Sequence, residues 1–239
     1  MRRLLTSIFF ASLTISVLHA QHIEQPFSIG VLFGPAFPVG KFASTGLDSS
    51  KIQSAAKTGL NAAITLTYHF PNSIFSIYAM GSWQQNGVDT KAFAKTLMSG
   101  YSDTISLAVD SKPWRTWAIL VGPRVELPLD ASGKCRIEFS FGGGIQQAIV
   151  PYYTITQYYT NGSDIGFYYG GSLNPVFCYQ FGSGFSYHMN RFWSLTINAS
   201  YTHITSVYNN NEYGAISDNQ HFVFPISSVN LLAGISYSF

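Results

Sequence analysis

The sequence predicts an all-β fold, an eight-stranded antiparallel up-and-down transmembrane β-barrel. Three observations support this prediction: few charged residues, eight segments in which apolar and polar residues alternate, and a regular alternation of long and short connections. Only 10% of the residues are charged and 16% are aromatic, against roughly 25% charged residues in a soluble domain. After residue 20, no apolar run approaches the length of about 20 residues that a spanning helix needs. This combination favours a protein that crosses a membrane with strands.

The chain begins with Arg2 and Arg3, followed by an apolar stretch over residues 4–18 and by Ala20. This is the order of a secretory signal peptide, which we expect to be removed after residue 20. A single spanning helix is the alternative, for which the run is short. Removing Arg2 and Arg3 from the 13 basic residues leaves 11, equal to the 11 acidic residues. The mature domain, residues 21–239, therefore has no electrostatic footprint for nucleic acid.

Eight segments show the two-residue period of β-strands: residues 27–34, 58–70, 74–85, 114–129, 134–150, 171–189, 191–207 and 229–239. Short turns at residues 71–73, 130–133 and 190 alternate strictly with long loops at residues 35–57, 86–113, 151–170 and 208–222. In a bacterial outer-membrane barrel this alternation places the turns and both chain ends on the periplasmic side and the four long loops outside the cell.

The last segment shows the pattern most clearly. Its odd positions are apolar, whereas its even positions, Leu232 apart, are small or polar: Val229, Leu231, Ala233, Ile235, Tyr237 and Phe239 against Asn230, Gly234, Ser236 and Ser238. Because side chains alternate across a strand, one face is apolar throughout. We interpret this segment as the strand that closes the barrel.

The pattern also separates two kinds of barrel. In a soluble eight-stranded barrel such as a lipocalin, the outward row is expected to be polar and the inward row apolar. Here the larger and more uniform row is apolar, and the opposite row contains Asn, Thr, Ser, Gly, Arg and Glu. We therefore expect the apolar row to face lipid and the polar row to fill the interior.

Aromatic residues gather near the ends of the predicted strands. This indicates two aromatic girdles at the membrane interfaces, although ordinary core packing is the alternative. The upper girdle, on the side of the long loops, is assigned Trp83, Trp117 and also Trp114. The lower girdle, on the side of the short turns, is assigned Tyr68, Phe70, Phe75, Tyr187, Trp193, Tyr237 and Phe239.

Charges within the strands are sparse and lie on the inward row. Arg124 and Glu126 precede the turn at residues 130–133, and Arg136 and Glu138 follow it, so the four side chains are expected to meet across the strand pair. Because an unpaired buried charge is costly and an eight-stranded barrel is narrow, we predict a polar cluster that fills the lower lumen. A gate or a proton-linked site is the functional alternative.

Catalytic and cofactor signatures are weak. His203 and Thr205 are predicted to point toward lipid, with Ser206 offset by one position and Asp218 as the nearest candidate carboxylate. A serine nucleophile needs a base within hydrogen-bonding reach and a third group that orients the base, so we expect no enzyme. We predict no cofactor and no metal site, with His69 and His188 as lone inward residues near the lower rim.

The two cysteines are expected to remain free thiols. Cys135 begins one predicted strand, whereas Cys178 lies midway along the next and on the opposite face. A disulfide requires close Cα atoms and converging Cβ vectors, and this placement offers neither.

The chain resembles the small outer-membrane β-barrel families with OmpA-like or OmpX-like transmembrane domains, most closely the PorT-like group common in Bacteroidota. The residues that carry the resemblance are the Ala20–Gln21 junction, an opening with Gly30, Gly34, Pro35 and Pro38 through Phe42, and the ending from Gly234 to Phe239. The resemblance implies insertion by the outer-membrane assembly machinery, which would read Tyr237 and Phe239 as its signal. It specifies an architecture and not one function.

Three functions follow as hypotheses. The leading one is a non-enzymatic outer-membrane barrel that acts through its loops or its lipid-facing wall, as a structural or interaction protein and as a subunit of a larger secretion or assembly complex. Its expected partners are outer-membrane lipid and lipopolysaccharide, the assembly machinery and other outer-membrane proteins. The alternatives are a narrow pore for ions or small solutes and an enzyme that modifies the acyl chains of lipid A.

Overall fold

The computed structural model describes residues 25–45, 54–98, 106–159, 162, 164–209 and 221–239. Ten strands form one antiparallel sheet, and eight of them close into a barrel: β1 (Phe27–Pro38), β2 (Ala56–His69), β3 (Phe75–Val88), β5 (Trp114–Pro128), β6 (Cys135–Tyr158), β8 (Val176–His188), β9 (Trp193–Asn209) and β10 (His221–Ser238). The pairing of β1 with β10 closes the ring. The prediction of an eight-stranded antiparallel barrel is confirmed.

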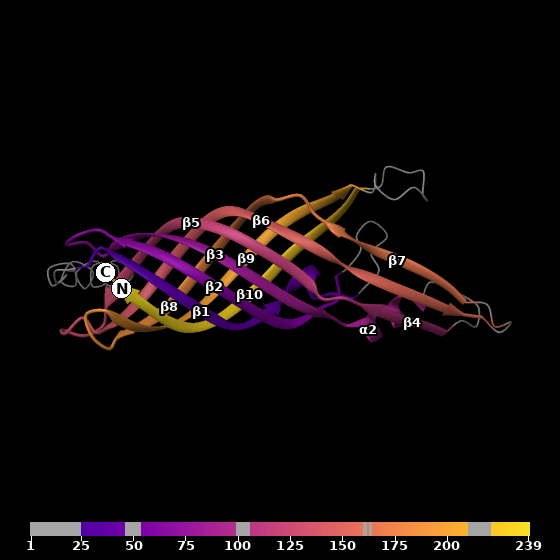
Figure 1. The fold of residues 1–239 in the computed structure, drawn as a ribbon, viewed down its shortest axis with the longest axis horizontal. Helices are drawn as coiled ribbons and strands as arrows, with labels where there is room; N and C mark the ends of the chain where they lie inside the picture. The colour runs from indigo at the N-terminus through magenta and orange to yellow at the C-terminus, as the bar shows by residue number, and fades with distance from the viewer. Residues whose placement is uncertain (1–24, 46–53, 99–105, 160–161, 163, 210–220) are drawn as a thin grey trace, which may run out of the picture.

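The barrel has two distinct ends (Figure 1). At the turn end, short connections join β2 to β3, β5 to β6 and β8 to β9. The main chains of Phe27 and Phe239 also pair there, with N–O distances of 3.3 and 2.8 Å. The opposite, loop end carries the 3₁₀ turn η1 (Gly40–Phe42), the helix α2 (Thr90–Met98) and two further strands, β4 (Ser106–Ser111) and β7 (Asp164–Ser172). The alternation of short and long connections is as predicted.

The outer wall of the barrel is apolar and the interior is mixed but largely polar. On β1 the outward residues Phe27, Ile29, Val31 and Phe33 are exposed, whereas Ser28, Gly30, Leu32 and Gly34 face inward. The same alternation recurs along β2, β5 and β10. This arrangement suits hydrocarbon outside the barrel, because water would leave a wall of large apolar side chains unfavourably solvated. Within the described residues, no helix has the length and apolarity to cross a membrane.

Two predicted loops contain regular structure. Residues 86–113 hold α2 and β4, and residues 151–170 hold the end of β6 and most of β7. Strand β6 has 24 residues and continues beyond the barrel, where it pairs with β4 on one edge and β7 on the other. Pro151 favoured a loop in the sequence, but it lies at a register shift between β6 and β7, where a residue without an N–H is tolerated.

The bounds of two other strands differ from those predicted. Pro35 does not end β1, because it remains paired with Leu60 on β2 and the strand reaches Pro38. Strand β8 begins at Val176 instead of residue 171, so Cys178 lies near its start and not midway along it. Cys135 and Cys178 are free thiols, and Cys178 is buried. The predicted signal peptide and Asp218 lie outside the described residues.

Glycines allow the narrow barrel to pack. A Cβ atom at Gly142 would meet the hydroxyl group of Tyr78, which reaches over β5 from β3. A Cβ atom at Gly144 would overlap the carbonyl oxygen of Ile119 on the neighbouring strand. The glycine run of β6 therefore admits an inward tyrosine and a close strand contact, as close packing inside a narrow barrel requires.

Candidate functional site: the filled lumen and the loop-end extension

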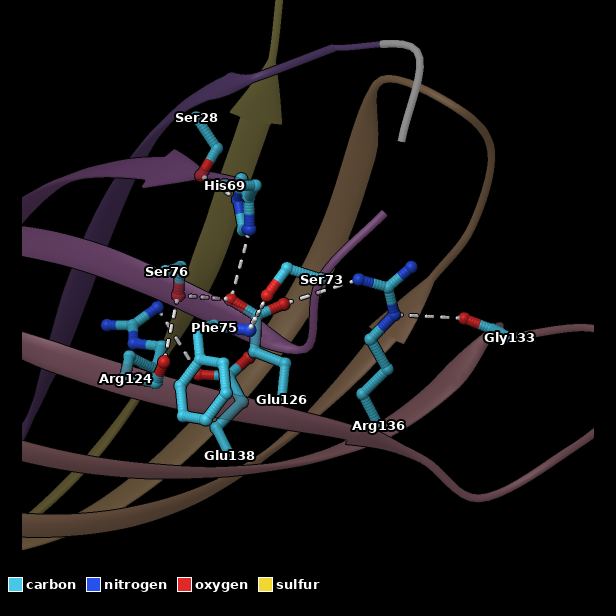
Figure 2. A network of polar contacts seen from close by, with 10 residues as sticks. All are labelled: Ser28, His69, Ser73, Phe75, Ser76, Arg124, Glu126, Gly133, Arg136 and Glu138. Atoms are coloured by element: carbon cyan, nitrogen blue, oxygen red, sulfur yellow. Dashed lines mark hydrogen bonds and ion pairs between the residues drawn. The ribbon is translucent and has the colours of Figure 1, made fainter. Parts of the chain in front are cut away.

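Near the turn end, the four predicted charges form two ion pairs inside the barrel, each between β5 and β6 (Figure 2). Arg136 Nη1 lies 3.3 Å from Glu126 Oε2, and Arg124 Nη1 lies 3.4 Å from Glu138 Oε2. Both glutamates are buried, and the two arginine side chains are mostly shielded from solvent. Each carboxylate therefore has a cationic partner, as burial in a low-dielectric interior requires.

His69 belongs to this cluster, although the sequence placed it as a lone rim residue. Its Nδ1 lies 3.1 Å from Glu126 Oε1 and its Nε2 lies 3.1 Å from Ser28 Oγ. Ser76 donates a further hydrogen bond of 3.0 Å to Glu126 Oε1. Counting register through the tight turn at residues 71–73 would have shown the connection, because His69 pairs with Ser76 and Ser76 with Arg124.

A polar cavity of about 40 Å³ adjoins the ionic cluster. It is lined mainly by hydroxyl groups and by Arg124, Glu126, Glu138, His69 and His188. On the loop side of the cavity, the inward side chains are larger and apolar: Leu32, Met80, Leu120 and Leu232 are buried, with Tyr78 beside them under the Arg124 guanidinium at 5.0 Å. The lumen is therefore filled at this level.

Above the apolar layer, amide side chains cross the lumen. Gln84 Oε1 accepts hydrogen bonds from Asn61 at 3.4 Å and from Ser228 at 3.1 Å, which joins β2 and β3 to β10. Gln84 Nε2 donates to Asn86 Oδ1 at 2.6 Å. Asn86 Nδ2 in turn donates to the carbonyl oxygens of Ala36 and Lys57. No sequence signal identified this network, because its members come from strands far apart in the chain.

The prediction that Trp114 belongs to the upper girdle is wrong. Its side chain is 1% exposed, its Nε1 donates to the Ser54 carbonyl oxygen at 3.1 Å, and its ring meets that of Phe42 edge-on at 5.5 Å. Trp114 lies at an inward-facing position of β5. It therefore covers the loop end of the lumen and does not face lipid.

The other predicted girdle residues occupy the outer wall. Trp83 and Trp117 are register partners on β3 and β5, and both are exposed. At the turn end, the ring of Tyr237 lies 4.9 Å from that of Trp193. The other residues predicted for this girdle also lie on the outer wall at that end: Tyr68, Phe70, Phe75, Tyr187 and Phe239. Their role at membrane interfaces stays a prediction.

His203 lies on the outer wall toward the loop end, with a partner that the sequence did not suggest. Its Nδ1 lies 2.6 Å from Ser227 Oγ and its Nε2 lies 3.2 Å from Thr205 Oγ1. The rings of Tyr179 and Tyr201 flank it at 5.4 and 6.4 Å. Ser227 was missed because the predicted closing strand began at Val229, whereas β10 begins at His221. Both ring nitrogens thus meet hydroxyl groups.

The strands β4, β6 and β7 form a three-stranded extension beyond the barrel, with α2 beside β4 (Figure 1). Phe93 of α2 stacks on Tyr153 of β6 at 5.1 Å, and Tyr153, Ile155 and Leu173 are buried. The Lys112 ammonium lies 5.6 Å from the ring centre of Tyr152. The extension thus has a hydrophobic core continuous with that of the barrel.

Comparison with known proteins gives similarity at the level of fold. Neisserial surface protein A is 13% identical, with a TM-score of 0.48 over 89% of this chain and 97% of its own. Ail, the attachment invasion locus protein of Yersinia pestis, solved with a heparin analogue, is 12% identical, with a TM-score of 0.43 over 90% and 99%. Escherichia coli outer membrane protein W is 15% identical, with a TM-score of 0.32 over 90% and 98%.

The sequence matches no protein family model. No curated protein matches it either. The similarity to the three solved structures concerns the fold alone.

Proposed function

We propose that this chain is a non-enzymatic integral protein of the bacterial outer membrane, whose loop-end extension binds another outer-membrane protein. The observation that carries the proposal is the contrast between a filled lumen and a structured extension. The lumen holds two ion pairs, an apolar layer and an amide network, whereas β6 continues past the barrel to build a three-stranded platform.

The outer wall supports the membrane location. Large apolar residues such as Ile64, Ile119 and Leu195 are about half exposed on every side of the barrel, which is costly in water and favourable in hydrocarbon. Insertion would place the turn end in the periplasm and the extension outside the cell. The resemblance of the chain's opening and closing segments to the PorT-like group favours a subunit role in a secretion or assembly complex.

A differential capture experiment tests the proposal. The full-length protein and a variant in which residues 151–172 are replaced by a short Gly-Ser linker are crosslinked in intact cells and purified in detergent. We expect a defined outer-membrane protein to co-purify with the full-length protein and to be lost from the linker variant. Identical co-purifying proteins for both forms, or the barrel alone in both, would contradict the proposal. Heat-modifiable migration on gels controls for folding of the variant barrel.

The pore hypothesis predicts steady conductance in planar bilayers. The filled lumen predicts its absence, because passage would require displacing the ion pairs and the layer around Leu120. Sustained open currents from the purified protein would therefore favour the pore.

An acyl-chain hydrolase is the second candidate, because Ser227 Oγ lies 2.6 Å from His203 Nδ1 on the outer side of β9 and β10, where Ser227 is buried. A serine nucleophile needs a base within hydrogen-bonding reach and a third group that orients the base. Here His203 meets Ser227, and Thr205 Oγ1 lies 3.2 Å from its other ring nitrogen. Lipid A profiles of cells that carry Ser227→Ala or His203→Ala test it. Altered profiles in both variants would favour the hydrolase, and unchanged profiles would favour the non-enzymatic protein.

A further inference from the structure

The loop half of the lumen contains several buried oxygen atoms that lack hydrogen-bond donors. They are Asn61 Oδ1, Gln146 Oε1, Gln180 Oε1, Ser200 Oγ and Asn230 Oδ1. Each parent residue is at most 5% exposed. A buried acceptor without a partner carries the full cost of its desolvation, so a group that supplies positive charge to several of them at once would be stabilising.

The hydrogen-bond network around Gln84 and Asn86 fixes the orientation of the Asn61 amide. Asn86 Nδ2 donates to two main-chain carbonyl oxygens, which leaves its Oδ1 to accept from Gln84 Nε2. Gln84 Oε1 must then face Asn61 Nδ2 and the Ser228 hydroxyl. Because the Asn61 nitrogen is used in this way, its carbonyl oxygen is the atom left over.

Ser228 and Asn230 extend the network to the other side of the lumen. The Ser228 hydroxyl donates to Gln84, so its oxygen accepts from Asn230 Nδ2 at 3.4 Å. The same nitrogen lies 3.5 Å from Thr202 Oγ1. Rotating the Asn230 amide would set its oxygen against the Ser228 oxygen, whose hydrogen is already donated to Gln84. The carbonyl oxygen of Asn230 is therefore also left free by the network and not by an arbitrary choice of rotamer.

Strand register brings the other oxygens to the same part of the lumen. Ser200 on β9 is the direct partner of Asn230 on β10. Gln180 on β8 is the direct partner of Thr202, which Asn230 contacts. Gln146 projects from the opposite wall on β6.

We propose that these amide and hydroxyl oxygens bind a dehydrated monovalent cation, with Asn61, Gln180, Ser200 and Asn230 as the principal ligands and Gln146 completing the shell. Hard cations prefer oxygen ligands, and neutral carbonyl oxygens can replace the hydration shell of a monovalent ion. In the described barrel strands the inward carboxylates are Glu126 and Glu138, and both belong to the cluster near the turn end. The site itself is thus uncharged, whereas calcium sites commonly include carboxylates.

The wild-type protein provides the primary test. Crystals grown in choline chloride are soaked in rubidium chloride, and anomalous scattering is measured at the rubidium edge. We expect an anomalous peak among the oxygens of Asn61, Gln180 and Asn230. Ordered water bonded to the same oxygens, without an anomalous peak, would overturn the proposal.

Stability measurements give an independent readout. Thermal unfolding in detergent is compared in sodium, potassium and choline chloride at equal ionic strength. We expect a saturable rise of the unfolding midpoint with sodium or potassium, and loss of this rise in Asn230→Leu. The control Ser194→Ala, which removes a buried hydroxyl group from the cavity near the turn end, should retain the rise. Equal midpoints in all three salts for the wild-type protein would contradict cation binding.

Discussion

Glu126 and Glu138 face each other as register partners on β5 and β6, so two carboxylates of like charge lie side by side in the lumen. Such a pair is destabilising by itself. Each carboxylate is compensated by an arginine from the other strand, Arg136 for Glu126 and Arg124 for Glu138. The two strands are thus held in register by two ion pairs, each with one partner on either strand.

This arrangement predicts that removing one arginine is costly. Arg124→Met should destabilise the barrel by about 3–5 kcal/mol, because Glu138 would lose its cationic partner while remaining buried. The double variant Arg124→Met/Glu138→Gln should recover most of this loss. Arg115→Met, at an exposed position on the same strand, should change stability by less than about 0.5 kcal/mol. Reversible denaturant unfolding in lipid vesicles measures all three, and an equal loss in the single and double variants would contradict a pairwise role.

Glycine positions in the wall predict opposite outcomes for the same substitution. Gly144→Ala should destabilise by about 1–3 kcal/mol, because its methyl group would occupy the place of the Ile119 carbonyl oxygen. Gly81→Ala should be neutral or stabilising by up to about 1 kcal/mol, because nothing lies within 4 Å of its added Cβ atom. Unfolding of both variants under identical conditions checks the prediction. Similar effects at the two positions would mean that the close strand contact is absent.

Tryptophan fluorescence distinguishes the two faces of the wall. In variants that retain one of the 4 tryptophans, lipids brominated near the headgroup should quench Trp83, Trp117 and Trp193, which face outward. Trp114 should be protected, because it is enclosed at the loop end of the lumen. Strong quenching of Trp114 together with protection of the other three would refute the inside-out arrangement. Bromine placed deep in the acyl chains serves as the control for interfacial depth.

The start of α2 should respond to pH. The Ala92 amide donates to the Asp89 carboxylate at 3.0 Å, and Lys57 lies 3.4 Å from it, and these contacts lower the pKa of Asp89. Because the folded pKa is below the ordinary value, the stabilisation is complete above the ordinary pKa and is lost as pH falls through the lowered value. Hydrogen exchange of the α2 amides should therefore accelerate in acid.

Asp89→Asn provides the matched control for this effect. Asparagine keeps an oxygen that can cap the first turn of α2 but cannot titrate in the acid range. We expect exchange in this variant to be independent of pH once intrinsic rates are corrected. An acid-induced loss of protection equal to that of the wild-type protein would assign the effect to another group.

Much of the barrel wall is determined locally by the sequence. Alternation at residues 229–239 sets which side chains face outward, and the tight turns at residues 71–73 and 130–133 connect neighbouring strands directly. For the same reason the Arg124, Glu126, Arg136 and Glu138 cluster was predictable: its members lie on two adjacent strands joined by a short turn. The alternation of side chains along each strand and the short turn between the strands were sufficient to predict the cluster.

Other features depended on tertiary structure. The hydrogen bond from Ser228 to Gln84 joins residues 144 positions apart and exists only because β1 pairs with β10 and closes the ring. The β4–β6–β7 extension was hidden because its strand pairs form beyond the barrel, where Pro151 interrupts the pattern. Parity specifies the face on which a side chain lies, but the stagger between strands decides its height in the barrel. The sequence therefore determined the inside and outside of this protein, and only closure of the sheet decided which residues meet across the lumen.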